Sequence, residues 1–275
     1  MIRKITHGYA LFNILSLDVA IGAVVSAVFF ARVLDVHLRI NSLIALGLTV
    51  WMIYTVDHLL DARKLKRDAS TERHKFHQKH FKALVIALTL AGLVVASQLF
   101  FVRTPVLIGG LVLSWIIVIY FLTLKKLKYL KELAGAILYT GGVLVAPLSL
   151  YHKLLTVSQV MLIGQFLLTA LINLLIFSWF DMEKDIQDRR ESFATYYGID
   201  FTYKTFMFLL VINVVTGIYI LLQIDEYRWM EIYLLLMNSV LAALAFEKKY
   251  FNTYDRYRVL GDAIFFIPLV YLLFQ

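Results

Sequence analysis

Two clusters of aspartates stand out in an otherwise apolar chain. In FDMEKDIQDRR, Asp181, Asp185 and Asp188 follow one another at intervals of four and three residues, which places them on one face of a helix. In VDHLLDARK, Asp57 and Asp61 have the same four-residue spacing. Like charges at this spacing destabilise a helix, so helix stability does not explain either cluster.

A divalent cation explains the pair of clusters better than solvation does. One cluster alone fits a solvated helix end whose acids pair with nearby Lys and Arg, but two clusters, each followed by basic residues, favour a shared ligand. Mg²⁺ prefers carboxylate oxygens and is usually completed by phosphates and water. The pattern therefore predicts a magnesium–diphosphate site with Asp61 and Asp185 at its centre. The expected ligands are Asp57, Asp61, Asp181, Asp185 and Asp188.

The composition indicates what kind of chain must hold these clusters. Of 275 residues, 61% are hydrophobic and only 17% are charged, and the mean hydropathy is +0.76. A soluble domain of this size does not need so much apolar material, so a polytopic membrane protein is expected. The net charge of +8 fits basic loops beside a membrane better than nucleic-acid binding, because no basic helix or RNA-type aromatic motif is present.

The apolar residues divide into nine runs, each long enough to cross a bilayer as a helix. The runs are too long for strands and lack the alternation of a membrane barrel. We therefore expect an all-α integral membrane protein, a bundle of about nine transmembrane helices, forming a single domain over residues 1–275. The predicted spans are 9–31, 41–60, 83–102, 105–124, 132–150, 157–180, 205–223, 229–246 and 259–274.

The basic residues predict the orientation of the bundle. With the N-terminus inside, the cytoplasmic segments hold 22 Lys and Arg and the outer segments hold 5. This asymmetry predicts an inside N-terminus, an outside C-terminus and a cytoplasmic position for both aspartate clusters. A bacterial cytoplasmic membrane is the expected location.

The two clusters lie at the ends of the second and sixth spans, and in this they resemble the UbiA superfamily of intramembrane prenyltransferases. DRRESFAT, residues 188–195, keeps the Asp, Arg and Thr spacing of that family's second motif, with Ser192 in place of Gly. The first motif departs further: Asp57 stands where Asn is usual, Asp61 matches the central Asp, and Leu65 replaces the last Asp.

A third stretch, YFLTLKKLKYLKELAG from residue 120, resembles the family's Tyr-then-basic segment with a gap one residue longer. The resemblance implies helices around a central cavity, in which Mg²⁺ and a prenyl diphosphate meet and an allylic cation forms. The prenyl group is then joined to an acceptor such as an aromatic quinone precursor. By resemblance, the catalytic residues are Asp61, Asp185, Lys125 and Tyr120.

Basic residues near the clusters have two interpretations, membrane topology or contact with the diphosphate. This holds for Arg63, Lys64, Arg67, Lys125, Lys126, Arg189 and Arg190. Four of them are expected to bind the substrate: Arg63, Lys64, Lys126 and Arg189.

Several polar residues lie outside the motifs. Asp18, with Asn13 nearby, falls inside the first span and is a candidate for acceptor binding or proton removal, or for an interhelical hydrogen bond. The histidine-rich stretch 74–80 is expected to be a solvated loop rather than a zinc site. His58 is expected to face away from both first-motif aspartates, and Asp262 to lie near the site.

Two other functions stay open from the sequence. The departures in the first motif are compatible with a UbiA-type terpene cyclase, which would quench the cation within the substrate. A transporter fits less well, because the acids gather at one membrane face rather than near the midplane.

Overall fold

A computed structural model describes residue 9 and residues 11–64, 72–123 and 130–274. These residues form helices and no strands, which confirms the all-α expectation. The longer helices are α2 (Leu17–Val33), α3 (Ile40–Lys64), α5 (Phe81–Leu99), α6 (Thr104–Thr123), α7 (Lys131–Leu150), α8 (Val157–Gln187), α10 (Ile199–Gln223) and α11 (Arg228–Phe246). The shorter ones are α4 (Glu72–Lys79), α9 (Phe193–Tyr197), α12 (Lys248–Asn252), α13 (Arg256–Ala263) and α14 (Ile267–Leu273), with 3₁₀ turns η2 (Asp225–Tyr227), η3 (Thr253–Asp255) and η4 (Ile264–Phe266).

Six of the described helices are long and apolar enough to cross a membrane, and α6 contributes a shorter apolar helix. The first and ninth predicted spans are interrupted. Ser16 adopts a left-handed backbone conformation (φ 56°), so the continuous part of the first span starts at Leu17. The ninth is divided into α13, η4 and α14, and Pro268 in the first turn of α14 lacks the N–H that would continue the helix.

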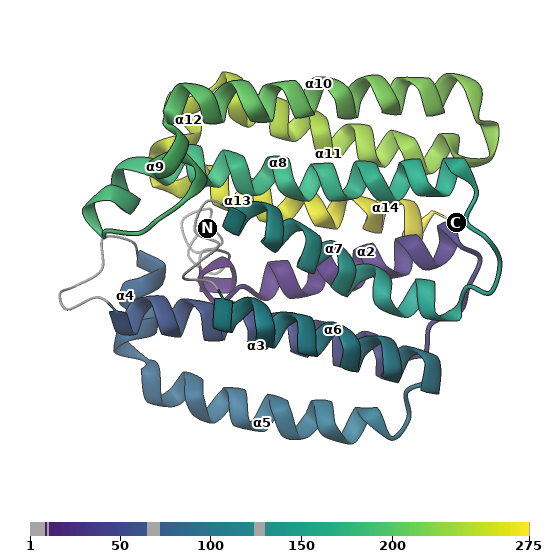
Figure 1. The fold of residues 1–275 in the computed structure, drawn as a ribbon, viewed down its shortest axis with the longest axis horizontal. Coiled ribbons are helices and arrows are strands. Elements are labelled where there is room, and N and C mark those ends of the chain that lie inside the picture. Colours follow the sequence, from purple (N-terminus) through teal and green to yellow (C-terminus); the bar gives the residue numbers. More distant parts are fainter. Residues whose placement is uncertain (1–8, 10, 65–71, 124–129, 275) are drawn as a thin grey trace.

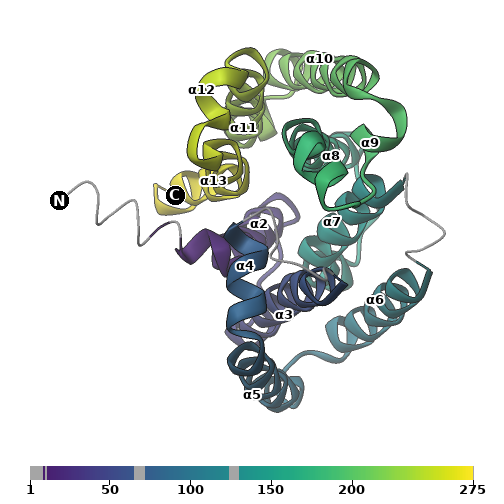
Figure 2. The same ribbon diagram turned by 90° about the vertical axis from the view of Figure 1, so that its left-hand side faces the viewer.

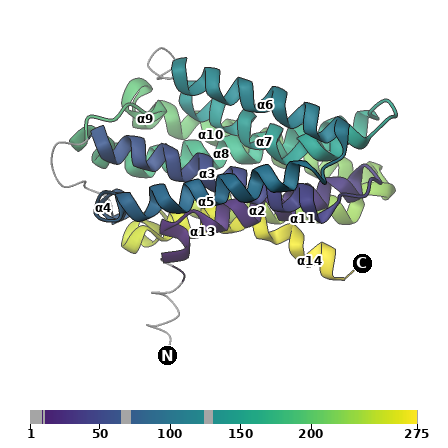
Figure 3. The same ribbon diagram turned by 90° about the horizontal axis from the view of Figure 1, so that it is seen from below.

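The long helices run side by side, and the short helices α4, α9 and α12 gather at one end of the bundle (Figure 1). Both α3 and α8 finish at that end, so the two aspartate clusters lie at the same face of the molecule (Figures 1 and 3).

Helix α8 is the centre of the second half of the bundle. It packs against α7, α10 and α11 and, near its C-terminal end, against α9 and α13. A capping box between Thr156 and Gln159 begins it. By contrast, α5 packs mainly on α3, and α6 mainly on α7, so these two lie at the outer edge (Figure 2).

Candidate active site

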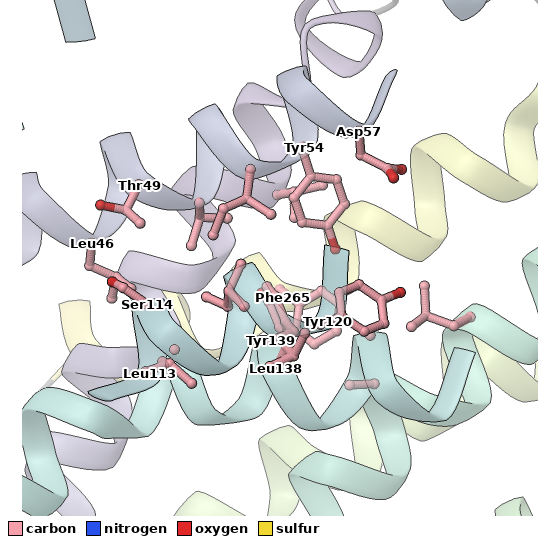
Figure 4. A pocket seen from close by; sticks show the side chains of 18 of the residues that line it. Leu46, Thr49, Tyr54, Asp57, Leu113, Ser114, Tyr120, Leu138, Tyr139 and Phe265 are labelled. Atoms are coloured by element: carbon pink, nitrogen blue, oxygen red, sulfur yellow. The ribbon is translucent and has the colours of Figure 1, made fainter. Parts of the chain in front are cut away.

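A cavity of about 430 Å³ lies between α3, α5, α6, α7 and α8, and α13 closes part of it. Asp57, Asp181 and Asp185 line one end. Figure 4 shows Asp57, Tyr54 and Tyr120 at this end, while Leu46, Thr49 and Ser114 lie toward the other. The cavity is therefore polar and acidic at one end and mainly apolar along the rest of its length.

Arg190 joins the two acidic helix ends. Its Nη2 donates to Asp61 Oδ2 of α3 at 2.9 Å, and its Nη1 lies 3.8 Å from Asp185 Oδ1 of α8. Lys131 Nζ, at the start of α7, lies 3.9 Å from the same oxygen of Asp61. The two clusters thus meet across a small group of cations.

The turn after α8 explains why Arg190, rather than its neighbour, faces the site. Arg189 adopts a left-handed conformation (φ 52°), and the backbone N–H of Arg190 donates to the Asp185 carbonyl at 2.7 Å. Arg189 is exposed and does not line the cavity, whereas Arg190 does. Directly afterwards, Ser192 and Thr195 form the capping box that begins α9. The serine that replaces the usual glycine is therefore a helix cap.

Asp181 is neutralised by residues that the sequence reasoning did not single out. Its carboxylate accepts hydrogen bonds from the Tyr257 hydroxyl and from Arg258, both on α13, and Lys184 Nζ lies 3.8 Å away. Lys184 also contacts Asp255 at 2.6 Å. In the sequence, Arg258 counts only as one of the basic residues that predict the orientation of the bundle. It lies 77 residues from Asp181, so no local pattern connects the two.

The remaining predicted residues have different positions. Tyr120 lines the cavity, as does Asp57. Asp188 is buried at the C-terminal cap of α8 and is not part of the lining. Arg63 is exposed and away from the cavity. Lys125, Lys126, Arg67 and the side chain of Lys64 lie outside the described residues.

The donors at the acidic end suit Mg²⁺, because they are carboxylate oxygens with cations around them. Within the described ranges, however, no three His, Cys, Asp or Glu side chains lie close enough together to hold a metal ion. Asp61, Asp181 and Asp185 are each paired with Arg or Lys instead. The residues fit the ion by chemistry, and the cations beside them fit the charge of a diphosphate.

Asn13 and Asp18 belong to a buried polar group behind the cavity wall. Asn13 Nδ2 donates to Asp18 and to Asp262 Oδ2, the latter at 2.9 Å, and Arg73 donates to Asn13 Oδ1 at 2.9 Å. Arg73 and Asp262 line the cavity, whereas Asn13 and Asp18 do not. The structure therefore places the two predicted residues in support of Arg73, which the sequence reasoning missed.

The expectation of a solvated loop over residues 74–80 was wrong for His74 and His77. Both lie in α4, spaced three residues apart on one face, and are almost fully buried. Their rings lie 5.9 and 5.2 Å from that of His58, which is buried and lines the cavity. Burial, reinforced by Arg190, lowers the pKa of His74 to about 3, and burial also lowers the pKa of His77. A lowered pKa favours the neutral form of both rings, and His77 Nδ1 also lies 2.8 Å from the Arg73 carbonyl oxygen.

No protein-family model matches the chain, and no curated protein matches it in sequence. Solved structures do match in fold. A UbiA homologue from Archaeoglobus fulgidus bound to DMAPP and Mg²⁺ superposes with a TM-score of 0.61 at 12% identity, over 94% of this chain and 98% of that chain. A UbiA homologue from the same organism bound to GPP and Mg²⁺ gives 0.64 at 12% identity, over 94% and 99%.

A third structure, from work on digeranylgeranylglyceryl phosphate synthase in membranes, gives a TM-score of 0.55 at 16% identity, over 94% of this chain and 97% of that chain. These likenesses extend over nearly the whole of each chain. The chain has the helical membrane fold of the UbiA homologues, as the aspartate motifs predicted.

Proposed function

We propose that the chain is a Mg²⁺-dependent intramembrane prenyltransferase that transfers an isoprenyl group from a prenyl diphosphate to an aromatic acceptor of the quinone-precursor type. The observation that carries the proposal is Arg190, which contacts Asp61 and Asp185 at the acidic end of a long apolar cavity. Carboxylates, a bridging cation and an apolar chamber are what a diphosphate head and an isoprenoid tail require. The DMAPP, GPP and Mg²⁺ bound by the similar structures support the same substrate class.

The metal is proposed to be held by aspartates of both clusters, with Asp61 and Asp185 as the central ligands. Asp57, Asp181 and Asp188 are proposed as further ligands or as contacts through water. When bound, Mg²⁺ neutralises the developing charge of the leaving diphosphate. Arg190, Lys131 and Arg258 stand beside the carboxylates and are positioned to take the remaining phosphate charge.

The aromatic side chains next to the acidic end have a separate role in the proposal. Tyr54, Tyr120 and Tyr139 line the cavity, and Figure 4 shows Tyr54 and Tyr120 beside Asp57. Their rings exclude water and present π faces that stabilise an allylic cation. The same apolar, aromatic surroundings suit an aromatic acceptor.

The acidic end of the bundle is proposed to face the cytoplasm, where water-soluble diphosphates are available. The basic residues support this orientation, with 22 Lys and Arg expected on the cytoplasmic side and 5 outside.

The test is turnover by the purified chain in lipid nanodiscs, given a radiolabelled prenyl diphosphate with and without an aromatic acceptor. We expect a prenylated conjugate that appears only with acceptor and Mg²⁺ and that is abolished by excess chelator. A cyclised hydrocarbon formed without acceptor would assign a terpene cyclase instead. No turnover under any condition would refute prenyl-diphosphate chemistry.

A further inference from the structure

The cavity extends far beyond what the acidic end needs. Asp57 and Ser42 both line it from the same helix, α3, and their separation of fifteen residues corresponds to about 22 Å along the helix axis. All charged lining residues belong to segments that meet at the Asp57 end. The far part is lined by aliphatic residues from α5, α6 and α7, such as Leu99, Val106 and Val145.

Two glycines face open space within this far part. Gly110 of α6 and Gly142 of α7 both line the cavity, and a Cβ added at either would meet no atom within 4 Å. Their neighbours differ: a Cβ at Gly109 would lie 2.7 Å from Ser149 Oγ, and one at Gly141 would lie 3.5 Å from Leu113. Gly109 thus serves the packing of α6 on α7. Gly110 and Gly142 are not needed for helix packing, and the absence of a side chain at these positions keeps the chamber wide.

The chamber wall formed by α5 and α6 is held by other helices: α5 packs mainly on α3, and α6 packs mainly on α7. The edge between α5 and α6 is therefore the place where a tail longer than the chamber would leave it.

We infer that the chain acts on prenyl diphosphates with tails of about twenty carbons or more, and that Gly110 and Gly142 are the residues that determine this preference. The inference rests on the proposed function. The reach of about 22 Å from Asp57 to Ser42 is about the extended length of four five-carbon isoprene units, which is a tail of twenty carbons. A five-carbon tail would leave most of the chamber unfilled and would lose the contacts that hold the substrate.

The experiment measures kcat/KM for diphosphates with five-, ten- and twenty-carbon tails in wild type, Gly110→Leu and Gly142→Leu. For wild type we expect the twenty-carbon substrate to be favoured over the five-carbon one by about tenfold or more. Each leucine should lower the ratio of twenty-carbon to five-carbon kcat/KM by about tenfold to a hundredfold, because its side chain occupies the space of the tail.

Gly164→Leu is the matched control. A Cβ at Gly164 also meets no atom within 4 Å, but this glycine of α8 does not line the cavity. It should keep the wild-type ratio, and thermal unfolding should show that all three variants are folded. A wild-type preference for five carbons, or an unchanged ratio in both cavity variants, would overturn the inference while leaving the proposed function intact. No turnover at any length would overturn the proposed function and the inference with it.

Discussion

Helix α8 carries two buried polar regions that differ in what faces them. In its first half, Gln165 and Thr169 meet polar residues of α10 and α11. Asn213 Nδ2 donates to Thr169 Oγ1 at 3.0 Å and to Asn238 Oδ1 at 2.9 Å, and Gln165 Nε2 donates to Glu231 Oε1 at 3.0 Å. In its last turns, Asp181 and Asp185 meet Arg258 and Arg190 instead.

Both regions place buried polar side chains of α8 against neighbouring helices, but they are chemically unlike, and the cations Arg190 and Arg258 of the second are partly exposed. The first consists mostly of amides that bond one another, none of its members lines the cavity, and Glu231 makes no ion pair with any described residue. The second consists of carboxylates and cations that open onto the cavity. Interhelical amide bonds hold membrane helices together. Burial of polar groups therefore does not by itself mark a site; charge beside a cavity does.

The largest effect is expected from Asp61→Asn and Asp185→Asn. Each removes a charge from the proposed metal site, so prenyl transfer should fall by on the order of a hundredfold or more, while the fold persists. Steady-state turnover and thermal unfolding of the same preparations measure both quantities. Glu72→Gln, at a side chain that is 76% exposed, is the control and should change neither. Normal turnover by both Asn variants would mean that the acidic end is only a solvated helix end.

Asn213→Ala should lower the stability of the fold and leave turnover almost unchanged, which is the reverse of the effect expected for the two aspartate variants. It removes hydrogen bonds to Thr169 and Asn238 and leaves buried partners unsatisfied, so unfolding free energy should fall by about 1–2 kcal/mol. Turnover per folded molecule should stay within about twofold, because the network does not touch the cavity. Ser239→Ala, on the exposed side of α11, is the control and should have little effect. A selective loss of turnover in Asn213→Ala would break the distinction between the two regions.

A smaller effect, on stability and not on turnover, is expected from His74 and His77 of α4, the short helix at the acidic end of the bundle. An unfolded histidine has a pKa near 6.5, whereas His74 in the folded chain has a pKa of about 3 and that of His77 is also lowered. Below about pH 6.5 the unfolded chain takes up protons that the folded chain does not, so stability falls as the pH drops, by at most about 1.4 kcal/mol per pH unit for each histidine. Above pH 7 these two histidines should add nothing to the pH dependence of the unfolding free energy.

The measurement is the midpoint of thermal unfolding between pH 5 and 8. Replacing His74 and His77 together with Gln should flatten the acid side of this profile, whereas His152→Gln, in the exposed connection between α7 and α8, should not. An unchanged slope in the double variant would show that α4 is not held by neutral histidines.

The smallest change in turnover is expected from two cysteine variants that test the orientation of the bundle in the membrane. The chain contains no cysteine, so Leu154→Cys and Glu247→Cys each create a single thiol at an exposed position. An impermeant thiol reagent added to intact cells should label the first and spare the second, with turnover unchanged in both. The reverse labelling would place the acidic end outside.

Much of the architecture follows from the sequence because a bilayer demands long apolar helices. The spans, the acidic helix ends and the spacing that aligns Asp57 with Asp61 and Asp181 with Asp185 all depend on local pattern, which the sequence displays directly. Even so, the breaks at Ser16 and before α14 needed the structure, because they depend on single backbone conformations.

The choice among basic residues was decided only by tertiary structure. Arg189 and Arg190 are neighbours, and one left-handed turn directs Arg190 to Asp61 and Asp185. Arg73 and Arg258 reach the cavity only because α4 and α13 fold back onto the ends of α3 and α8. A Lys or Arg side chain near the membrane surface favours the same membrane orientation whichever way it points. Its ion-pair partner therefore depends on which helix, distant in sequence, packs beside it.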